Sequence, residues 1–159
     1  MLSSVRSMGL YGMDSYPVTV ESDLSTGLPS FELVGLPDTA VKESRDRVRA
    51  AIRNCGLSFP ISHITINLAP ADLKKAGPLY DLPILLSILR SSGQIGAVPS
   101  DAVFIGELSL SGEVRPVGGC LTMALGAREA GFSSIYLPKE NAAEASVAQG
   151  IAVYPVSDV

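Results

Sequence analysis

Hydrophobic and polar residues alternate through the first third of the chain, which is the pattern of half-buried β-strands. The alternation covers residues 4–12, 16–24 and 27–36, and short segments rich in Gly, Ser, Asp and Pro separate the three stretches. Strands joined by such short turns pair with their sequence neighbours. We therefore expect an antiparallel meander of three adjacent strands.

The spacing of apolar residues changes to a helical period in the stretch DTAVKESRDRVRAAIRNCG, residues 38–56. Asp38 or Thr39 is a typical N-cap, and Gly56 is a typical residue at the end of a helix. One side of this helix carries a stripe of mostly apolar residues. The stripe consists of Val41, Ser44, Val48, Ala51, Ile52 and Cys55. We expect an amphipathic helix that lies on the sheet.

The remaining two thirds of the chain alternate between strand and helix patterns. Strands are expected over 61–70, 102–110, 113–117, 133–139 and 151–156, and helices over 81–92, 120–130 and 140–149. Asp81 is the expected N-cap of the second helix, whose surface is almost wholly apolar. The order predicts an α+β domain of two layers, a mixed sheet with helices mainly on one face. No linker or repeat divides residues 1–159, so we expect one domain, followed by further chain because residue 159 comes directly after a strand.

The composition offers few residues that could act as catalytic groups or metal ligands. The chain is 47% hydrophobic with a mean hydropathy of +0.32, and no apolar run approaches the roughly 20 residues that span a bilayer. The N-terminus has no apolar stretch of the signal-peptide kind, so we expect a cytoplasmic protein without membrane contact. His63 is the single histidine, and Cys55 and Cys120 are far apart and best interpreted as reduced packing residues. We expect no metal site and no Ser-His-Asp triad.

Charge is distributed unevenly along the chain. The net charge is −4, yet residues 42–53 carry five bases against two acids. The rest of the chain carries seven bases against fourteen acids, which makes it strongly acidic. This balance excludes a general nucleic-acid-coating protein, because the acidic remainder would repel phosphates. Any phosphate contact must use the single basic helix.

Three sequence runs carry a family resemblance: LVGLPDTAVKESRDRVRAAI, ITINLAPADLKKAGPLYDLPILLSIL and GELSLSGEVRPVGG. They resemble the N-terminal domain of the magnesium-chelatase-like AAA+ proteins, the group of competence protein M, over essentially the whole chain. That domain is similar to the proteolytic domain of Lon, and the resemblance implies this fold with a left-handed crossover. It also implies a downstream AAA+ module that binds ATP and Mg²⁺, ring-shaped homo-hexamers, and DNA processing in recombination or transformation. The partners implied are the protein's own AAA+ module, neighbouring subunits and DNA.

The resemblance also identifies where catalytic residues would lie. A Lon-type peptidase uses a serine nucleophile and a lysine base. These two positions correspond here to Leu79 in AGPLYD and Met123 in GGCLTMALGA. Neither side chain can attack a carbonyl or accept a proton, which implies a non-catalytic domain with no catalytic or cofactor-binding residues. The alternative is a Lon-type ATP-dependent serine peptidase with a substitute dyad.

A substitute dyad would have to combine Lys74 or Lys75 with a serine of the second helix. The three candidate serines, Ser87, Ser91 and Ser92, begin about two turns past the start of that helix, too far from the Gly118-Gly119 turn to share a site with it. The two lysines are instead interpreted as solvated loop charges or partner contacts. Asp81 could be catalytic in principle, but the N-cap role accounts for it.

Basic residues on the first helix are the remaining candidate contacts. They are Lys42, Arg45, Arg49 and Arg53, spaced 3, 4 and 4, and they align beside the apolar stripe. They either meet DNA phosphates or an acidic neighbouring domain, or they form a solvated face. The solvated face, which we favour, would be braced by Glu43–Arg47 and Asp46–Arg49 pairs. Two helix N-termini, after Gly77 and after Gly119, are weaker candidates for anion binding.

Overall fold

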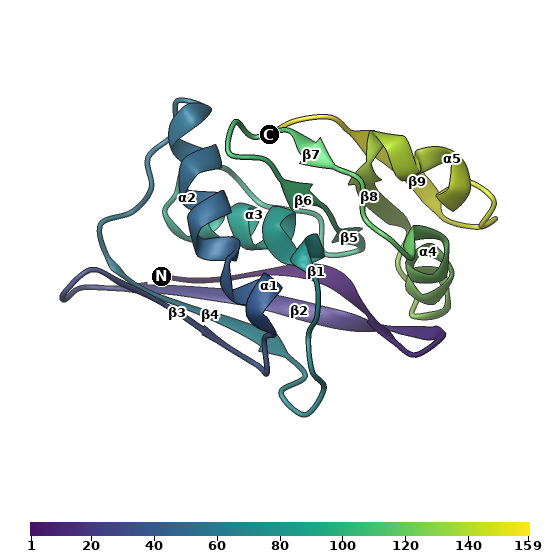
Figure 1. Ribbon diagram of the computed structural model, residues 1–159, viewed down its shortest axis with the longest axis horizontal. Coiled ribbons are helices and arrows are strands. Elements are labelled where there is room, and N and C mark those ends of the chain that lie inside the picture. The colour runs from purple at the N-terminus through teal and green to yellow at the C-terminus, as the bar shows by residue number, and fades with distance from the viewer.

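Seven strands form one mixed sheet in the computed structural model, which describes residues 1–159 (Figure 1). Their order is β3-β4-β2-β1-β5-β8-β9. The strands are β1 (Leu2–Tyr11), β2 (Asp14–Ser25), β3 (Ser30–Val34), β4 (His63–Ala69), β5 (Ala102–Phe104), β8 (Ser134–Pro138) and β9 (Ala152–Val156). A separate two-stranded sheet pairs β6 (Glu107–Leu108) with β7 (Val114–Arg115). The expected mixed sheet is confirmed.

Five α-helices and two short 3₁₀ turns complete the domain. The helices are α1 (Thr39–Lys42), α2 (Ser44–Asn54), α3 (Asp81–Ser91), α4 (Cys120–Glu129) and α5 (Ala142–Ala145). The 3₁₀ turns are η1 (Pro78–Tyr80) and η2 (Lys139–Asn141). Helices α2 and α3 lie over the half of the sheet that contains β1 to β4, α4 lies between the β1–β2 hairpin and β8, and α5 lies beside β9 (Figure 1). None of these helices has both the length and the apolar character that crossing a bilayer requires.

The expected three-strand meander is wrong at its third strand. β1 and β2 form the predicted antiparallel hairpin, but β4 lies between β2 and β3 and pairs parallel with β3. β4 alternates three fully buried residues, Ile64, Ile66 and Leu68, with half-buried ones, and therefore buries more apolar surface than β3. β3 is short and contains no fully buried residue, which suits an edge position. Burial, not proximity in sequence, decides the strand order.

The predicted helix over 38–56 is present but divided at Glu43 into α1 and α2. Asp38 caps α1 through a 2.8 Å hydrogen bond from the backbone N–H of Val41, as expected. The predicted stripe faces the core, because Val41 to Ile52 of the stripe are buried and Cys55 is half-buried. At the break, the carbonyl of Ala40 accepts a 2.7 Å hydrogen bond from the Arg47 guanidinium. A side chain thus satisfies a backbone group that the break leaves free.

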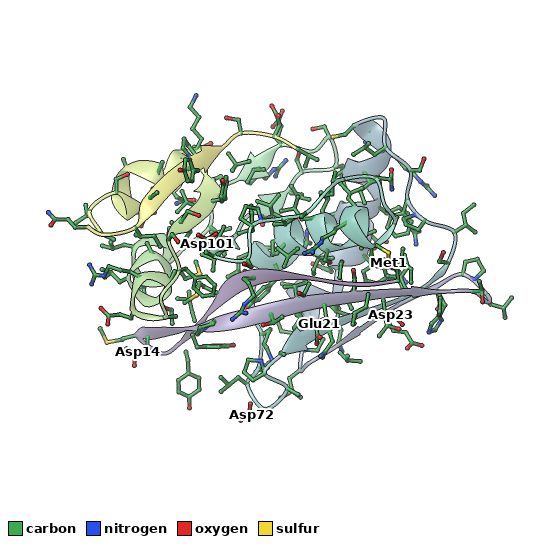
Figure 2. The ribbon with its side chains drawn as sticks, turned by 180° about the vertical axis from the view of Figure 1, so that it is seen from behind. Met1, Asp14, Glu21, Asp23, Asp72 and Asp101 are labelled. Carbon is green, nitrogen blue, oxygen red and sulfur yellow. The ribbon has the colours of Figure 1, made fainter.

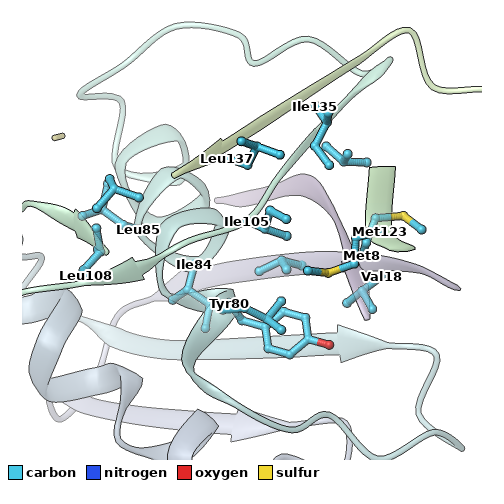
Figure 3. Packing of buried hydrophobic residues seen from close by; sticks show 14 of the residues in the cluster. Met8, Val18, Tyr80, Ile84, Leu85, Ile105, Leu108, Met123, Ile135 and Leu137 are labelled. Atoms are coloured by element: carbon cyan, nitrogen blue, oxygen red, sulfur yellow. The ribbon is translucent and has the colours of Figure 1, made fainter. Parts of the chain in front are cut away.

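One hydrophobic cluster of 30 buried residues connects the helices to both halves of the sheet (Figure 3). It extends from Met8 and Val18 in the hairpin, through Ile84 in α3, to Ile135 in β8. Helix α4 approaches the hairpin closely at Gly126, where an added Cβ would lie 1.8 Å from the Ser15 hydroxyl. A larger residue would require the Ser15 and Met8 side chains to move.

Candidate functional site

The two positions that correspond to the Lon dyad lie in the hydrophobic core. Leu79, in η1, is 6% exposed and Met123, in α4, is fully buried, and both belong to the main cluster. Figure 3 shows Met123 beside Met8 and Val18. The turn before α4 is also tightly packed, because a Cβ at Gly119 would lie 2.7 Å from the Leu10 side chain. These positions hold packed hydrocarbon and a thioether, with no group able to transfer a proton.

Lys75 is buried, so its interpretation as a solvated loop charge is wrong. Its ammonium donates hydrogen bonds to the carbonyls of Gly35 (2.9 Å), Leu73 (2.6 Å) and Pro70. Burial lowers the pKa of Lys75, and Asp72 opposes this shift. The ammonium therefore ties the loop before η1 to the segment after β3. Lys74 is exposed, as expected of a solvated charge.

The serines of α3 are bonded to backbone groups and to other serines. Ser87 donates to the carbonyl of Ile84, and Ser91 lies 2.9 Å from the Ser22 hydroxyl of β2. The Ser87 carbonyl accepts hydrogen bonds from Ser3 of β1 and from Ser22. These buried hydroxyls join the helix to the sheet. None of them contacts a lysine amine.

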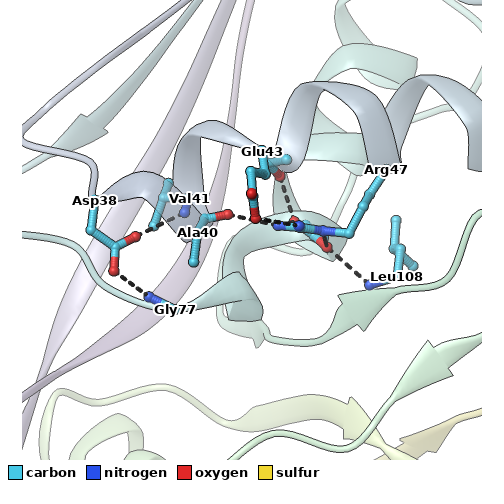
Figure 4. Close-up of polar contacts among 9 residues, drawn as sticks. Asp38, Ala40, Val41, Glu43, Arg47, Gly77 and Leu108 are labelled. Carbon is cyan, nitrogen blue, oxygen red and sulfur yellow. Dashed lines mark hydrogen bonds and ion pairs between the residues drawn. The ribbon is translucent and has the colours of Figure 1, made fainter.

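Asp81 does not cap α3, contrary to expectation; it is the first residue of α3, and Tyr80 occupies the cap position. The buried carboxylate accepts hydrogen bonds from Arg47 Nε (2.6 Å), from Ser44 (2.5 Å) and from the backbone N–H of Leu108 (3.0 Å) (Figure 4). Burial raises the pKa of Asp81, and the bond from Arg47 is the strongest opposing effect. Asp81 thus connects α2, α3 and β6 in a structural network.

Of the two ion pairs expected on the basic face, one is present and the other is not. Glu43 does pair with Arg47 at 3.5 Å, although Arg47 chiefly turns inward to Asp81. Asp46 pairs with Arg45 at 3.5 Å and not with Arg49. Because Asp46 pairs with the neighbouring Arg45, the guanidinium of Arg49 has no acidic partner.

Three of the predicted contact residues line one groove. The arginine groove, as we call it, has a volume of about 360 Å³ and lies between α2, the start of β3 and the loop before β4. Its walls are Arg45, Arg49 and Arg53 of α2 with Pro29, Ser30, Phe31, Phe59, Pro60, Ile61 and Ser62. A second hollow, lined by Phe31, Leu33, Lys42 and Arg45, adjoins it through the two residues that they share. No acidic residue lines either hollow.

Arg49 lines the arginine groove between Arg45 and Arg53. Its guanidinium carbon lies 5.2 Å from the centre of the Phe59 ring, and that ring stacks on Phe31 at 6.4 Å. The Nε of Arg49 is buried without a hydrogen-bond partner. A buried donor without an acceptor is uncommon in folded proteins and is costly.

The apolar wall of this groove was not predicted from the sequence. Phe59, Pro60 and Ile61 belong to a loop without periodicity, and their only signal is an apolar run between a helix and a strand. Of the weaker candidates, the backbone N–H of Gly77 donates to the carboxylate of Asp38 at 3.2 Å, so an acidic side chain already occupies that helix start. His63 contacts Ser30 through its Nδ1 atom at the edge of the groove.

The fold is that of a Lon-like domain, in which the two positions expected to match the dyad hold Leu79 and Met123. Over 138 residues the chain is 27% identical to Lon protease from Metamycoplasma arthritidis, covering 82% of the chain and 16% of that protein. The family model described as subunit ChlI of Mg-chelatase matches residues 20–141. The chain therefore belongs to this family, which confirms the resemblance seen in the sequence.

Two curated relatives share higher identity. YifB from Salmonella typhimurium is 48% identical over 144 residues, which are 90% of the chain and 28% of that protein. Competence protein ComM from Haemophilus influenzae is 43% identical over 147 residues, or 92% of the chain and 29% of the relative. The chain thus spans less than a third of the length of these relatives.

Proposed function

We propose that this chain is the non-catalytic N-terminal domain of a magnesium-chelatase-like AAA+ ATPase of the competence type, which processes DNA. Membership of the Mg-chelatase family and 43% identity to a protein named competence protein support this role. ATP and Mg²⁺ would bind to the downstream AAA+ module. The domain itself would contact that module, neighbouring subunits of a cytoplasmic homo-hexamer, or the substrate.

The observation that carries the non-catalytic role is the buried apolar pair at Leu79 and Met123. Serine peptidase chemistry needs a hydroxyl that attacks and an amine that accepts its proton. A hydrocarbon and a thioether can do neither. Lys75, the one buried amine near η1, already donates to three backbone carbonyls and has no serine hydroxyl as a partner.

Incubation of the full-length protein with fluorescein-labelled casein, ATP and Mg²⁺ tests this role. We expect no peptide release above the rate without enzyme, while an active Lon protease in parallel cleaves the substrate. ATP-dependent cleavage that disappears on changing Ser87, Ser91 or Ser92 to Ala would overturn it in favour of a Lon-type peptidase. The AAA+ architecture has a separate test, which is a Gly-x-x-x-x-Gly-Lys-Ser/Thr segment downstream of Val159.

A further inference from the structure

We propose that the arginine groove binds a single strand of DNA, with phosphates on the guanidinium groups of α2 and a base against the apolar wall; this deepens, and rests on, the proposed role in DNA processing. In the groove the basic helix meets apolar side chains, including the exposed Ile61. Both kinds of group are needed to hold an unpaired nucleotide.

The positive charge of the groove extends along the helix. Arg45, Arg49 and Arg53 follow one another at intervals of four residues, so their Cα atoms span about 12 Å along the helix axis. Lys42 extends the same row into the adjoining hollow. A single phosphate could contact only one or two of these groups. The row is matched to a ligand that carries several negative charges in a line.

The opposite wall provides apolar surface for a base. Ile61 is 87% exposed, and the planar guanidinium of Arg49 lies over the half-buried Phe59 ring, which stacks on Phe31. Aromatic and apolar side chains beside a basic row are typical of sites for single-stranded nucleic acid, because each unpaired base exposes a face that can stack. Bases in a duplex are already stacked on one another and cannot use this wall.

The charge of the remaining surface limits binding to this groove. Outside residues 42–53 the chain carries twice as many acids as bases. Figure 2 shows several of these acids, including Asp14, Asp23 and Asp72, on the view from behind. Their field repels a polyanion, so a strand is drawn to the groove alone. An acidic peptide would meet the same field, but carboxylates on flexible side chains have no planar faces that could stack beside Ile61 and the Arg49 guanidinium.

Fluorescence anisotropy with a labelled oligothymidine of 20 nucleotides measures the binding. The test variant is Arg45→Glu/Arg53→Glu, because both side chains are exposed and their substitution leaves the core intact. The control, Arg115→Glu/Lys139→Glu, makes the same change in net charge at two exposed residues away from the groove. We expect the test variant to lose about tenfold or more in affinity at low salt, since each lost phosphate contact removes counterion release. The control should change affinity less than about twofold.

Two further variants test the details. Arg49→Lys keeps the charge but loses the planar group over Phe59, and we expect partial loss of affinity. Ile61→Ala, at an exposed residue, should weaken oligothymidine binding but leave binding of polyglutamate unchanged. The proposal is overturned if the unmodified chain does not bind oligothymidine, if the control pair weakens binding as much as the test pair, or if duplex DNA or polyglutamate binds more tightly. Casein cleavage with intact oligothymidine binding would refute the non-catalytic role and leave the groove assignment standing.

Discussion

At the scale of single residues, the fold removes two ionisable groups from water in different ways. Lys75 keeps its charge next to three carbonyl oxygens, whereas the thiol of Cys120 is buried among apolar groups at the start of α4. Burial raises the pKa of Cys120 to about 12, and nearby Glu144 adds to the shift. Lys74, which is exposed, and Cys55, which is half-buried, serve as controls for tests of these two groups.

Replacing Lys75 with Met should destabilise the domain by about 2–4 kcal/mol, because three buried carbonyls lose their donor. The measurement is urea unfolding followed by circular dichroism. Lys74→Met is the matched control, and at this exposed residue the change should stay within about 0.5 kcal/mol. Equal effects of the two substitutions would show that Lys75 has no special structural role.

Cys120 should resist alkylation in the folded protein, because its thiol is buried and its pKa of about 12 leaves almost no thiolate at pH 8. Iodoacetamide followed by mass spectrometry should label Cys55, which is half-buried, and label Cys120 only in denaturant. The raised pKa also has a consequence for stability. As the pH rises from 9 towards 12, the unfolded thiol loses its proton while the buried one keeps it, so stability falls in this range.

At the scale of elements, the contact between α2 and α3 depends on a buried ion pair. The Asp81 side chain is 1% exposed and that of Arg47 20% exposed, and Asp81 also accepts a bond from β6. The pair is therefore a junction of three elements that are distant in sequence. A buried charge that loses its partner is strongly unfavourable.

The substitution Asp81→Asn should cost about 3 kcal/mol of unfolding free energy, because it removes the buried charged partner of Arg47 and leaves only the exposed carboxylate of Glu43 at 3.5 Å. Asp46→Asn, on the exposed face of α2, is the control; this carboxylate is 68% exposed and the expected change is below about 1 kcal/mol. Denaturant unfolding of both variants at pH 7 measures the difference. A loss below 1 kcal/mol in Asp81→Asn would refute the structural role of the pair.

At the scale of the whole molecule, the two halves of the sheet are joined by little hydrogen bonding. β1 and β5 share a single registered pair, Arg6 with Val103. The main hydrophobic cluster nevertheless contains residues from both halves, among them Val20 of β2 and Leu137 of β8. Side-chain packing, rather than the strand ladder, makes the domain a single unit.

We therefore predict one cooperative unfolding transition for the domain. Far-UV circular dichroism and tyrosine fluorescence should give the same midpoint. Ile105→Ala, at a fully buried position between the halves, should lower both midpoints together and cost about 2–4 kcal/mol. Ile61→Ala, at an exposed position, should leave both unchanged. Separate midpoints for the two probes would show that the halves unfold independently.

The sequence by itself determined what depends on local pattern. It predicted the β1–β2 hairpin, the cap at Asp38 and the buried stripe of α2, because periodicity and capping act within a few residues. The family resemblance, carried by contiguous motifs, also implied that Leu79 and Met123 stand at the dyad positions.

Only the tertiary structure decided the contacts between distant segments. Three features join residues that are about 30 or more positions apart in the sequence. They are the insertion of β4 between β2 and β3, the hydrogen bond from Lys75 to the carbonyl of Gly35, and the pairing of Asp81 with Arg47. The arginine groove belongs to the same group, because α2 supplies its charge and an aperiodic loop supplies its apolar wall. Charge and burial determine which distant residues come into contact, and the local spacing of residues along the chain does not indicate these contacts.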